Sequence, residues 1–469
     1  MMPWIIFFHA IITAKVTKDL DHCLNQSGQD AKNESKTPEL SQPVAQQESS
    51  SLPPDGQTGV QGPVEQRTES RVRRLRLLAD CLPTPTSHLF YLLATDATSL
   101  PRPYAEKLED RHIAYMPNPA PGNKPITVGH KYSVIAILPE KNGPSAPPWA
   151  IPLSIEQIPS HQTDKSVAAK QIRTLLTDAD LPFLNHLAVN VADSLYCTAH
   201  FLGSVNDINN LINIVRCSSN RVFYFQPDPT ESRKKKGHPT WYGQRFDMKD
   251  PDSWGNPDQT ISYQVAMASG KIAILEQEVW NDLLMRGKQK IPMHKDPFTL
   301  IRCRLLNEDG SLVFNRPLWL IVFGKRRMEL SPEKAWLCYR QRYDIEHFFR
   351  FGKNHLLMGR YQTSVVEHEE NWLEIIGLAY FQLWIASSLA TSLPYPWERY
   401  SMPTDSSKPP GPSMTQRNFE RIIQQVGKQP PPPKPRGKSP GRLLGQCPGL
   451  RQKQEVVFKG KKRTKKKAA

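Results

Sequence analysis

The chain has 469 residues and a formal net charge of +16, from 61 lysines and arginines against 45 aspartates and glutamates. Residues 428–469 hold fourteen of the basic residues and one acid, so they carry +13 and leave +3 for residues 1–427. This distribution excludes a uniformly basic, histone-like protein and indicates a near-neutral body with a basic tail that meets a polyanion.

The first segment, residues 1–70, is predicted to be a disordered or atypical leader. From residue 15 onward it is rich in Gln, Ser, Pro and acids and has few aromatic residues. The apolar run at residues 3–14 has no Lys or Arg before it, so we do not expect an export signal.

Residues 71–219 alternate apolar runs with amphipathic segments and are predicted to be the first part of an α/β domain. The pattern predicts helices at 72–78, 164–176 (capped by Asp164) and 194–209, and strands at 89–95, 131–138, 149–153, 186–192 and 211–216. This order predicts an α/β domain, in which one mixed sheet is flanked by helices.

The next segment, residues 220–330, breaks the alternation and is predicted to be a β-rich insertion. Strand-like runs lie at 222–225, 298–305 and 318–323. A basic stretch at 233–238 leads into aromatic residues, a mixture that suits either a DNA-contacting loop or a turn with solvated charges.

Residues 331–400 are predicted to be the second, helical part of this α/β domain. A helix is expected to start at Ser331 and Pro332, a polar cap followed by proline. The apolar stretch at 372–393 approaches membrane length, but Glu374 and Gln382 interrupt it. We therefore expect a buried helix there and no membrane partner. Residues 401–469 form a proline-rich, basic C-terminal tail.

Four polar side chains recur at fixed spacing near residue 345: Tyr339, Arg342, Glu346 and Lys353. On a single helix they would share an arc of roughly 60°, with the apolar residues elsewhere. A solvated face with an Arg342–Glu346 ion pair, worth only about 0.3–0.5 kcal/mol, is the alternative. The aromatic residue and the single acid favour a binding stripe.

Two further carboxylates, Asp96 and Asp193, follow predicted strands. Sites of open α/β sheets lie at such strand ends, and neighbouring strands are about 4.8 Å apart. If the two strands are adjacent, both aspartates and Glu346 could bind Mg²⁺ or Mn²⁺, and two ions could carry out phosphodiester displacement. Aspartates at strand ends also often act only as turn formers.

The stripe resembles the Y-x2-R-x3-E-x6-K signature of bacterial insertion-sequence DDE transposases. This resemblance implies a ribonuclease H-like fold in which Asp96, Asp193 and Glu346 are the catalytic, metal-binding carboxylates for two Mg²⁺ or Mn²⁺ ions. Tyr339 and Arg342 would contact the DNA backbone at the cleaved end, and Lys353 nearby DNA. The family implies cut-and-paste transposition of double-stranded DNA by a homodimer, without a small-molecule substrate.

Other features bear on cellular location and on rival functions. The seven cysteines are scattered and form no C-x-x-C pair, which indicates a reducing compartment. We expect a cytoplasmic, nucleoid-associated protein. The leader differs from the helical DNA-binding region usual in the family, so an inactive, DNA-binding remnant is one alternative. Another ribonuclease H-like nuclease, such as a resolvase, is the second.

Overall fold

The computed structural model describes residues 63–103, 105, 108–115, 126–141, 143, 145–228, 240–267, 270–361, 363, 365–390 and 409–426. The chain divides into two units, residues 1–69 with 417–442 and residues 70–416 with 443–469. The sheet and the candidate site lie in the second unit. Helix α2 (Pro63–Leu77) begins inside the predicted leader, and α8 (Pro412–Val426) lies inside the predicted tail. The rest of both segments, and the basic stretch 233–238, lie outside the described residues.

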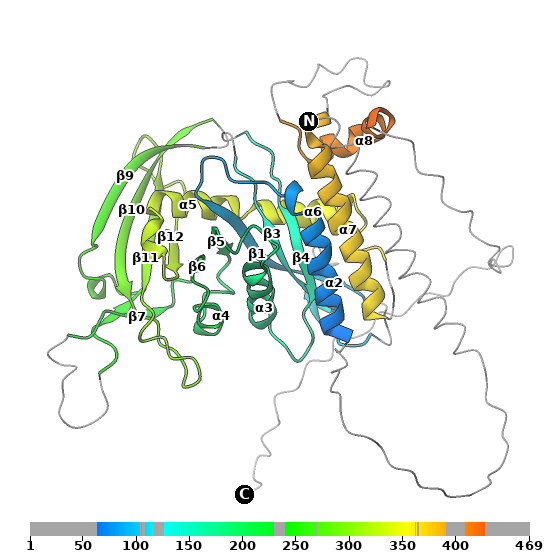
Figure 1. The fold of residues 1–469 in the computed structure, drawn as a ribbon. Coiled ribbons are helices and arrows are strands. Elements are labelled where there is room, and N and C mark those ends of the chain that lie inside the picture. Colours follow the sequence, from blue (N-terminus) through cyan, green and yellow to red (C-terminus); the bar gives the residue numbers. More distant parts are fainter. Residues whose placement is uncertain are drawn as a thin grey trace, which may run out of the picture. The chain divides into compact units, whose positions relative to one another are not determined.

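One ten-stranded mixed sheet forms the centre of the larger unit (Figure 1). Its path runs β2-β3-β1-β5-β6-β12-β11-β10-β9, and β4 pairs with β3. The strands are β1 (Phe90–Pro101), β2 (His112–Tyr115), β3 (Ile126–Ile137), β4 (Ile151–Gln157), β5 (Leu187–Ala192), β6 (Leu211–Cys217), β9 (Gln259–Ala266), β10 (Ile272–Leu283), β11 (Phe298–Leu306) and β12 (Leu318–Phe323). Helices flank the sheet, so the predicted fold class, a ribonuclease H-like mixed α/β sheet, is confirmed.

The central strands are parallel, which explains their composition. β1 runs parallel to β5, and β5 parallel to β6. Every residue of β5 is buried, because helices cover both faces of a parallel sheet and leave no solvent-facing side. Continuous apolar runs therefore predicted these strands correctly.

The segment predicted as a β-rich insertion contains six strands. Four of them, β9 to β12, continue the main sheet, because β12 pairs antiparallel with β6. The short strands β7 (Val222–Tyr224) and β8 (Arg245–Asp247) pair separately. β9 and much of β10 were not predicted, since β9 is an edge strand whose residues are mostly exposed. The boundaries at 220 and 330 remain predictions.

The helices differ from the predicted ones in several places. Helix α3 (Asp164–Thr177) begins after Thr163, whose side chain accepts the Ser166 N–H, so Thr163 and not Asp164 is the cap. The helix predicted at 194–209 is only α4 (Ala199–Ser204).

The predicted single helix around Glu346 was wrong. The chain forms α5 (Pro332–Gln341) and α6 (Asp344–Asn354), with a break at Arg342 and Tyr343. Hydrogen bonds between residues three positions apart replace the α-helical bonds between residues four positions apart there. The Arg342 N–H donates to the Tyr339 carbonyl, and the Ile345 N–H donates to the Arg342 carbonyl. The Gln341 side chain also donates to the Pro139 carbonyl, and Lys141 pairs with Asp344. These contacts anchor the break to the loop after β3.

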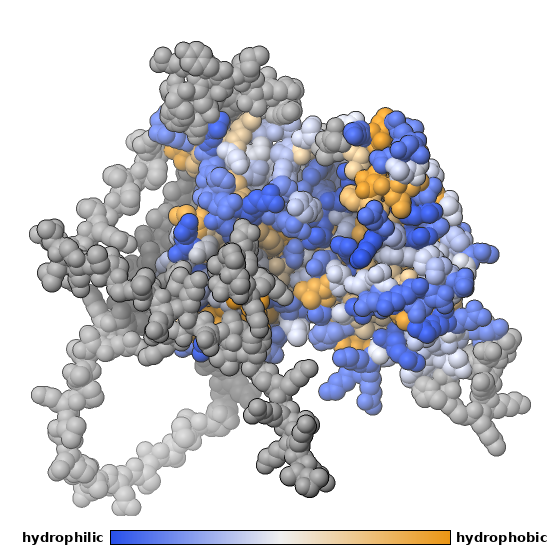
Figure 2. Space-filling model, turned by 180° about the vertical axis from the view of Figure 1, so that it is seen from behind, coloured by the Kyte–Doolittle hydropathy of each residue, from blue (hydrophilic) through white to orange (hydrophobic). Residues whose placement is uncertain are grey.

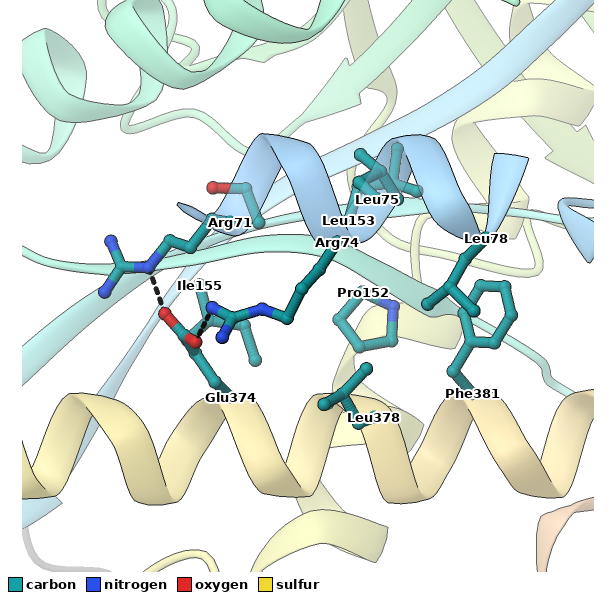
Figure 3. A pocket seen from close by; sticks show the side chains of 12 residues that line it. Arg71, Arg74, Leu75, Leu78, Pro152, Leu153, Ile155, Glu374, Leu378 and Phe381 are labelled. Atoms are coloured by element: carbon teal, nitrogen blue, oxygen red, sulfur yellow. Dashed lines mark hydrogen bonds and ion pairs between the residues drawn. The ribbon is translucent and has the colours of Figure 1, made fainter. Parts of the chain in front are cut away.

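Helix α7 (Val366–Ala386) packs on β4 through one face only. Its extension Val366–Leu389 is, among the described helices, long and apolar enough to cross a membrane by length and composition alone, and 28% of its apolar window is buried. The helix expected at 372–393 is therefore only partly buried, and the absence of a membrane partner remains a prediction. Figure 3 shows α2 beside α7, where Arg71 and Arg74 both pair with Glu374.

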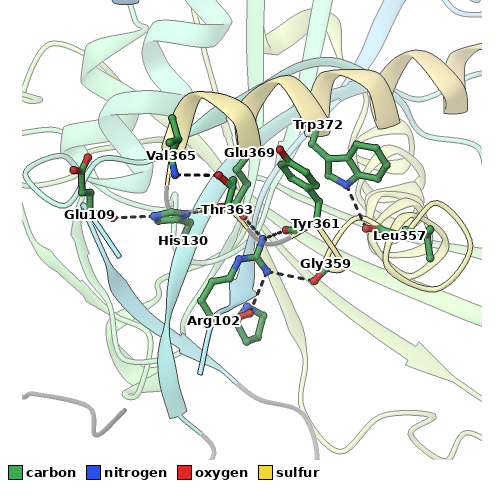
Figure 4. Close-up of polar contacts among 11 residues, drawn as sticks. Arg102, Glu109, His130, Leu357, Gly359, Tyr361, Thr363, Val365, Glu369 and Trp372 are labelled. Carbon is green, nitrogen blue, oxygen red and sulfur yellow. Dashed lines mark hydrogen bonds and ion pairs between the residues drawn. The ribbon is translucent and has the colours of Figure 1, made fainter. Parts of the chain in front are cut away.

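A buried charge network ties the start of α7 to the sheet (Figure 4). Glu369 accepts from Arg102, which follows β1, and pairs with His130 Nδ1 of β3 at 2.6 Å. Arg102 also donates to the carbonyls of Gly359 and Tyr361, in the segment between α6 and α7. Burial, the largest single effect, would lower the pKa of His130, but the hydrogen bonds to Glu369 and the Glu109 carbonyl and the charge of Glu369 together outweigh it, so this pKa is raised. The network therefore ties the start of α7 and the segment before it to the sheet.

Figure 2 shows the surface from behind, where polar residues cover most of the described area and apolar residues form separate patches. Exposed large apolar side chains include Phe314 and Met328. Scattered exposure of this kind is usual for a protein surface.

Candidate active site

The two aspartates lie side by side on adjacent parallel strands. β1 and β5 pair in register up to Thr95 opposite Ala192, and Asp96 and Asp193 are the next residues along each strand. β1 itself continues to Pro101, because it still pairs with β3 beyond this point. Asp96 thus lies inside a strand rather than after one, but at the point where its parallel pairing ends.

Each aspartate uses one carboxylate oxygen on the backbone. Asp96 Oδ1 accepts the Ala97 N–H at 2.8 Å, and Asp193 Oδ1 accepts the Leu195 N–H at 2.8 Å. Asp193 is therefore a turn former, as the alternative interpretation proposed. Its second oxygen has no hydrogen bond to a described residue, so the turn leaves that oxygen available for other chemistry.

Arg342 joins the sheet to the helix that carries Glu346. Its Nη1 lies 3.1 Å from Asp96 Oδ2, and its Nη2 lies 2.9 Å from Glu346 Oε1. The centre of the Tyr339 ring lies 5.8 Å from the guanidinium carbon. The structure thus brings Tyr339, Arg342 and Glu346 together with Asp96, although two helices carry them instead of one.

The electrostatics of the site are dominated by burial of charge. Burial raises the pKa of Asp96 to about 6, against the opposing effects of Arg342 and the Ala97 N–H, and Asp193 and Glu346 raise it further. Burial also raises the pKa of Tyr339. An ionised Asp96 is therefore costly in this environment and calls for a cation.

Lys353 is less closely connected to the carboxylates. It lies on α6 about two turns after Glu346 and on the same side of that helix. Burial lowers the pKa of Lys353, and no ion pair joins it to a described residue. A half-buried ammonium without an acidic partner is suited to bind an incoming anion.

Arg216 is a residue that the sequence interpretation missed. Ala192 pairs with Val215 of β6, so Arg216 is the next residue in the row that holds Asp96 and Asp193. Arg216 is exposed. Its positive charge lowers the pKa of Tyr339, which opposes the increase that burial causes. The sequence did contain a signal for this residue, since Arg216 is the last residue of the strand predicted at 211–216 and so has a position like those of Asp96 and Asp193.

A row of buried polar side chains fixes the register of the three central strands. Thr95 Oγ1 lies 2.6 Å from Asn190 Oδ1, and Asn190 Nδ2 donates to Asn213 Oδ1 at 2.9 Å. All three side chains are buried, so losing one partner would leave another without its hydrogen bond. A slip of one residue would break this row, which therefore holds Asp96 beside Asp193.

Residues 63–273 match the family model of the DDE superfamily endonucleases. The match covers a little under half of the chain and includes Asp96 and Asp193, whereas Glu346 and the rest of its signature lie beyond it. It supports a DDE-type endonuclease and does not distinguish the signature subgroup. A comparison with curated proteins finds no match.

The carboxylates of Asp96, Asp193 and Glu346 fit a divalent metal in their chemistry, since hard oxygen ligands suit Mg²⁺ or Mn²⁺ and Asp96 is largely buried. In the structure, however, the three carboxylates are not arranged around a common point where a metal ion could bind. Within the described part of the chain, no three acidic, His or Cys side chains lie close enough to hold an ion together. The guanidinium of Arg342 lies between Asp96 and Glu346 instead.

Three tryptophans of the segment 220–330, Trp241, Trp254 and Trp280, differ in their burial. Trp280 is buried and packs against Trp254 and Trp319. Arg302 lies over the Trp254 ring. Trp241 is half exposed and stacks on His294 at 4.2 Å. Of the three, Trp241 alone keeps a large accessible surface.

Asp96→Asn is expected to stabilise the metal-free protein at pH 7 by about 2 kcal/mol. The pKa of Asp96 in the folded protein is about 6, above its ordinary 3.8, so ionisation costs folding free energy that is fully felt above pH 6. The gain should therefore shrink as the pH falls from 6 toward 4. Urea denaturation in the presence of a chelator at both pH values measures it, and an equal gain at both would contradict the cause given.

Proposed function

We propose that the chain is a transposase that cleaves and transfers DNA strands at the ends of an insertion sequence, in a metal-dependent reaction. The observation that carries this proposal is the placement of Asp96 beside Asp193, with Glu346 linked to Asp96 through Arg342. Carboxylates from two adjacent strands and one helix can share metal ions, and Mg²⁺ or Mn²⁺ is the expected cofactor.

In this proposal Asp96, Asp193 and Glu346 hold two metal ions. When bound, the ions would activate a water or a DNA 3′-hydroxyl for attack and stabilise the leaving oxygen. The two aspartates come from the rigid centre of the sheet, whose register is fixed by Asn190, so their spacing is pre-organised.

The positive side chains around the carboxylates would bind the DNA backbone. Arg342, Lys353 and Arg216 offer guanidinium and ammonium groups that suit phosphate oxygens, and Tyr339 offers a ring and a hydroxyl. The basic tail, residues 428–469, adds charge that attaches to DNA without reading its sequence. Double-stranded DNA is thus the proposed partner, bound by a homodimer in the nucleoid region of the cytoplasm.

A nicking assay tests the proposal. The full chain is incubated with supercoiled plasmid DNA and Mg²⁺ or Mn²⁺, and product ends are mapped. We expect nicks with 3′-hydroxyl ends that require the metal and are absent with Glu346→Gln. His347→Gln, the next residue on the same helix, is the matched control and should nick as the wild type does.

Two results would contradict the proposal. Binding of DNA without any nicking, equal in the wild type and Glu346→Gln, would favour an inactive remnant that only competes for element ends. Nicking that never leads to joining of a DNA end to a target would favour another ribonuclease H-like nuclease.

A further inference from the structure

Arg342 bridges two of the three carboxylates that the proposed function assigns to metal. Its two terminal nitrogens lie 3.1 Å from Asp96 Oδ2 and 2.9 Å from Glu346 Oε1. The side chains of Arg342 and Asp96 are 14% and 18% exposed, so water weakens this contact little, whereas Glu346 is 37% exposed and its contact is more screened. The guanidinium therefore meets the same oxygens that a metal ion would need.

The guanidinium of Arg342 and a divalent metal ion cannot both bind these carboxylate oxygens at the same time. A divalent ion binds carboxylate oxygens at about 2.0–2.2 Å and needs several of them directed at one point. The bridging guanidinium directs Asp96 and Glu346 toward its own nitrogens, and it carries a positive charge that repels the ion. We propose that Arg342 is an internal counter-cation, which neutralises Asp96 and Glu346 before metal binds and must leave them for metal to enter. This inference rests on the proposed function.

The energetics favour such an exchange over permanently unpaired carboxylates. Asp96 is costly as a buried anion, and the charge of Arg342 is the largest effect that offsets the cost of its burial. Arg342 cannot lose its own charge at accessible pH. An apo site without this cation would contain mutually repelling carboxylates, so Arg342 keeps the empty arrangement folded.

The position of Arg342 in the chain suits movement. It caps α5, and α6 begins only at Asp344, so its side chain extends from a break rather than from the middle of a helix. Tyr339 beside it can retain contact with the guanidinium. A DNA phosphate, which matches the guanidinium in charge and geometry, is the natural acceptor once the carboxylates release it. Metal and DNA should then promote each other's binding.

Binding of Mn²⁺ to the full chain without DNA tests the inference, with free Mn²⁺ measured by electron paramagnetic resonance. Arg342→Gln removes the competing charge and should bind Mn²⁺ about tenfold more tightly than the wild type. Arg326→Gln removes an exposed positive charge whose ion-pair partner is Glu329 and not one of the three carboxylates, and it should leave the affinity unchanged.

Arg342→Lys provides a second variant in case the glutamine protein does not fold. Its ammonium keeps the charge but cannot bridge both carboxylates, so its Mn²⁺ affinity should lie between those of the wild type and Arg342→Gln. Equal affinities for the wild type and the Arg342 variants, or weaker binding by the variants, would overturn the competition and leave the proposed function standing. No saturable binding by any of these proteins would overturn both.

Discussion

Glu369→Ala is expected to destabilise the protein by about 3–5 kcal/mol, because removing one partner of a buried charge network leaves the others uncompensated. Glu369 and His130 are fully buried, and Arg102 is 2% exposed. Without Glu369, His130 can become neutral but Arg102 cannot. Urea denaturation at pH 7, monitored by tryptophan fluorescence, measures the change in the free energy of unfolding.

His368→Ala is the matched control for this prediction, since His368 is the preceding residue of α7 and is exposed. Its effect on the free energy of unfolding should stay within about 0.5 kcal/mol.

The raised pKa of His130 adds a pH dependence to the effect of Glu369→Ala. The charged pair of His130 with Glu369 is present below the ordinary His pKa and is lost as the pH rises through the raised pKa, so the difference between wild type and variant should shrink in alkaline solution by the His130 part, while the Arg102 part remains. A loss below about 1 kcal/mol at pH 7 would contradict the account of the network.

Asp193→Asn is expected to lower metal-dependent strand cleavage by roughly a thousandfold, in the range seen when one group of a charge-stabilising site is removed. The substitution preserves the turn, because an asparagine oxygen can still accept the Leu195 N–H. What it removes is the negative charge and the second oxygen that faces no described partner. Initial rates of plasmid nicking at saturating Mn²⁺ measure the effect.

Asp309→Asn provides a matched control, since Asp309 also accepts the N–H of the residue two positions later. Asp309 is exposed and lies more than a hundred residues after Asp193 in the sequence. Its cleavage rate should equal that of the wild type. If Asp193→Asn cleaves at more than a tenth of the wild-type rate while folded, the turn is the main role of Asp193 and the metal role fails.

The sequence predicted the centre of the fold well because burial leaves a strong signal there. The apolar runs at 89–95, 186–192 and 211–216 became β1, β5 and β6, whose parallel pairing places Asp96 beside Asp193. β9 escaped prediction, because an exposed edge strand needs no apolar run. The helix predicted at 194–209 shrank to α4, since tertiary contacts and turn chemistry outweighed its weak periodicity.

The site was harder to predict than the fold. The spacing of Tyr339, Arg342 and Glu346 indicated one helix, but contacts of Gln341 and Asp344 with the loop after β3 break it at Arg342. Such contacts join residues about two hundred positions apart and leave no local pattern. The same is true of Arg216, which becomes a neighbour of Asp193 only through the register of β5 and β6. The catalytic roles themselves remain predictions.

The position of β12 in the sheet has a consequence for how the protein is made. β6 is buried and apolar, and one of its sides is completed only by Leu318–Phe323, about a hundred residues later in the chain. A shortened chain that ends at residue 273, where the family match ends, would expose the unpaired side of β6 as an open edge. Open apolar edges recruit strands from other chains. Such a fragment should aggregate, and a growing chain on the ribosome needs its sheet protected until β12 emerges.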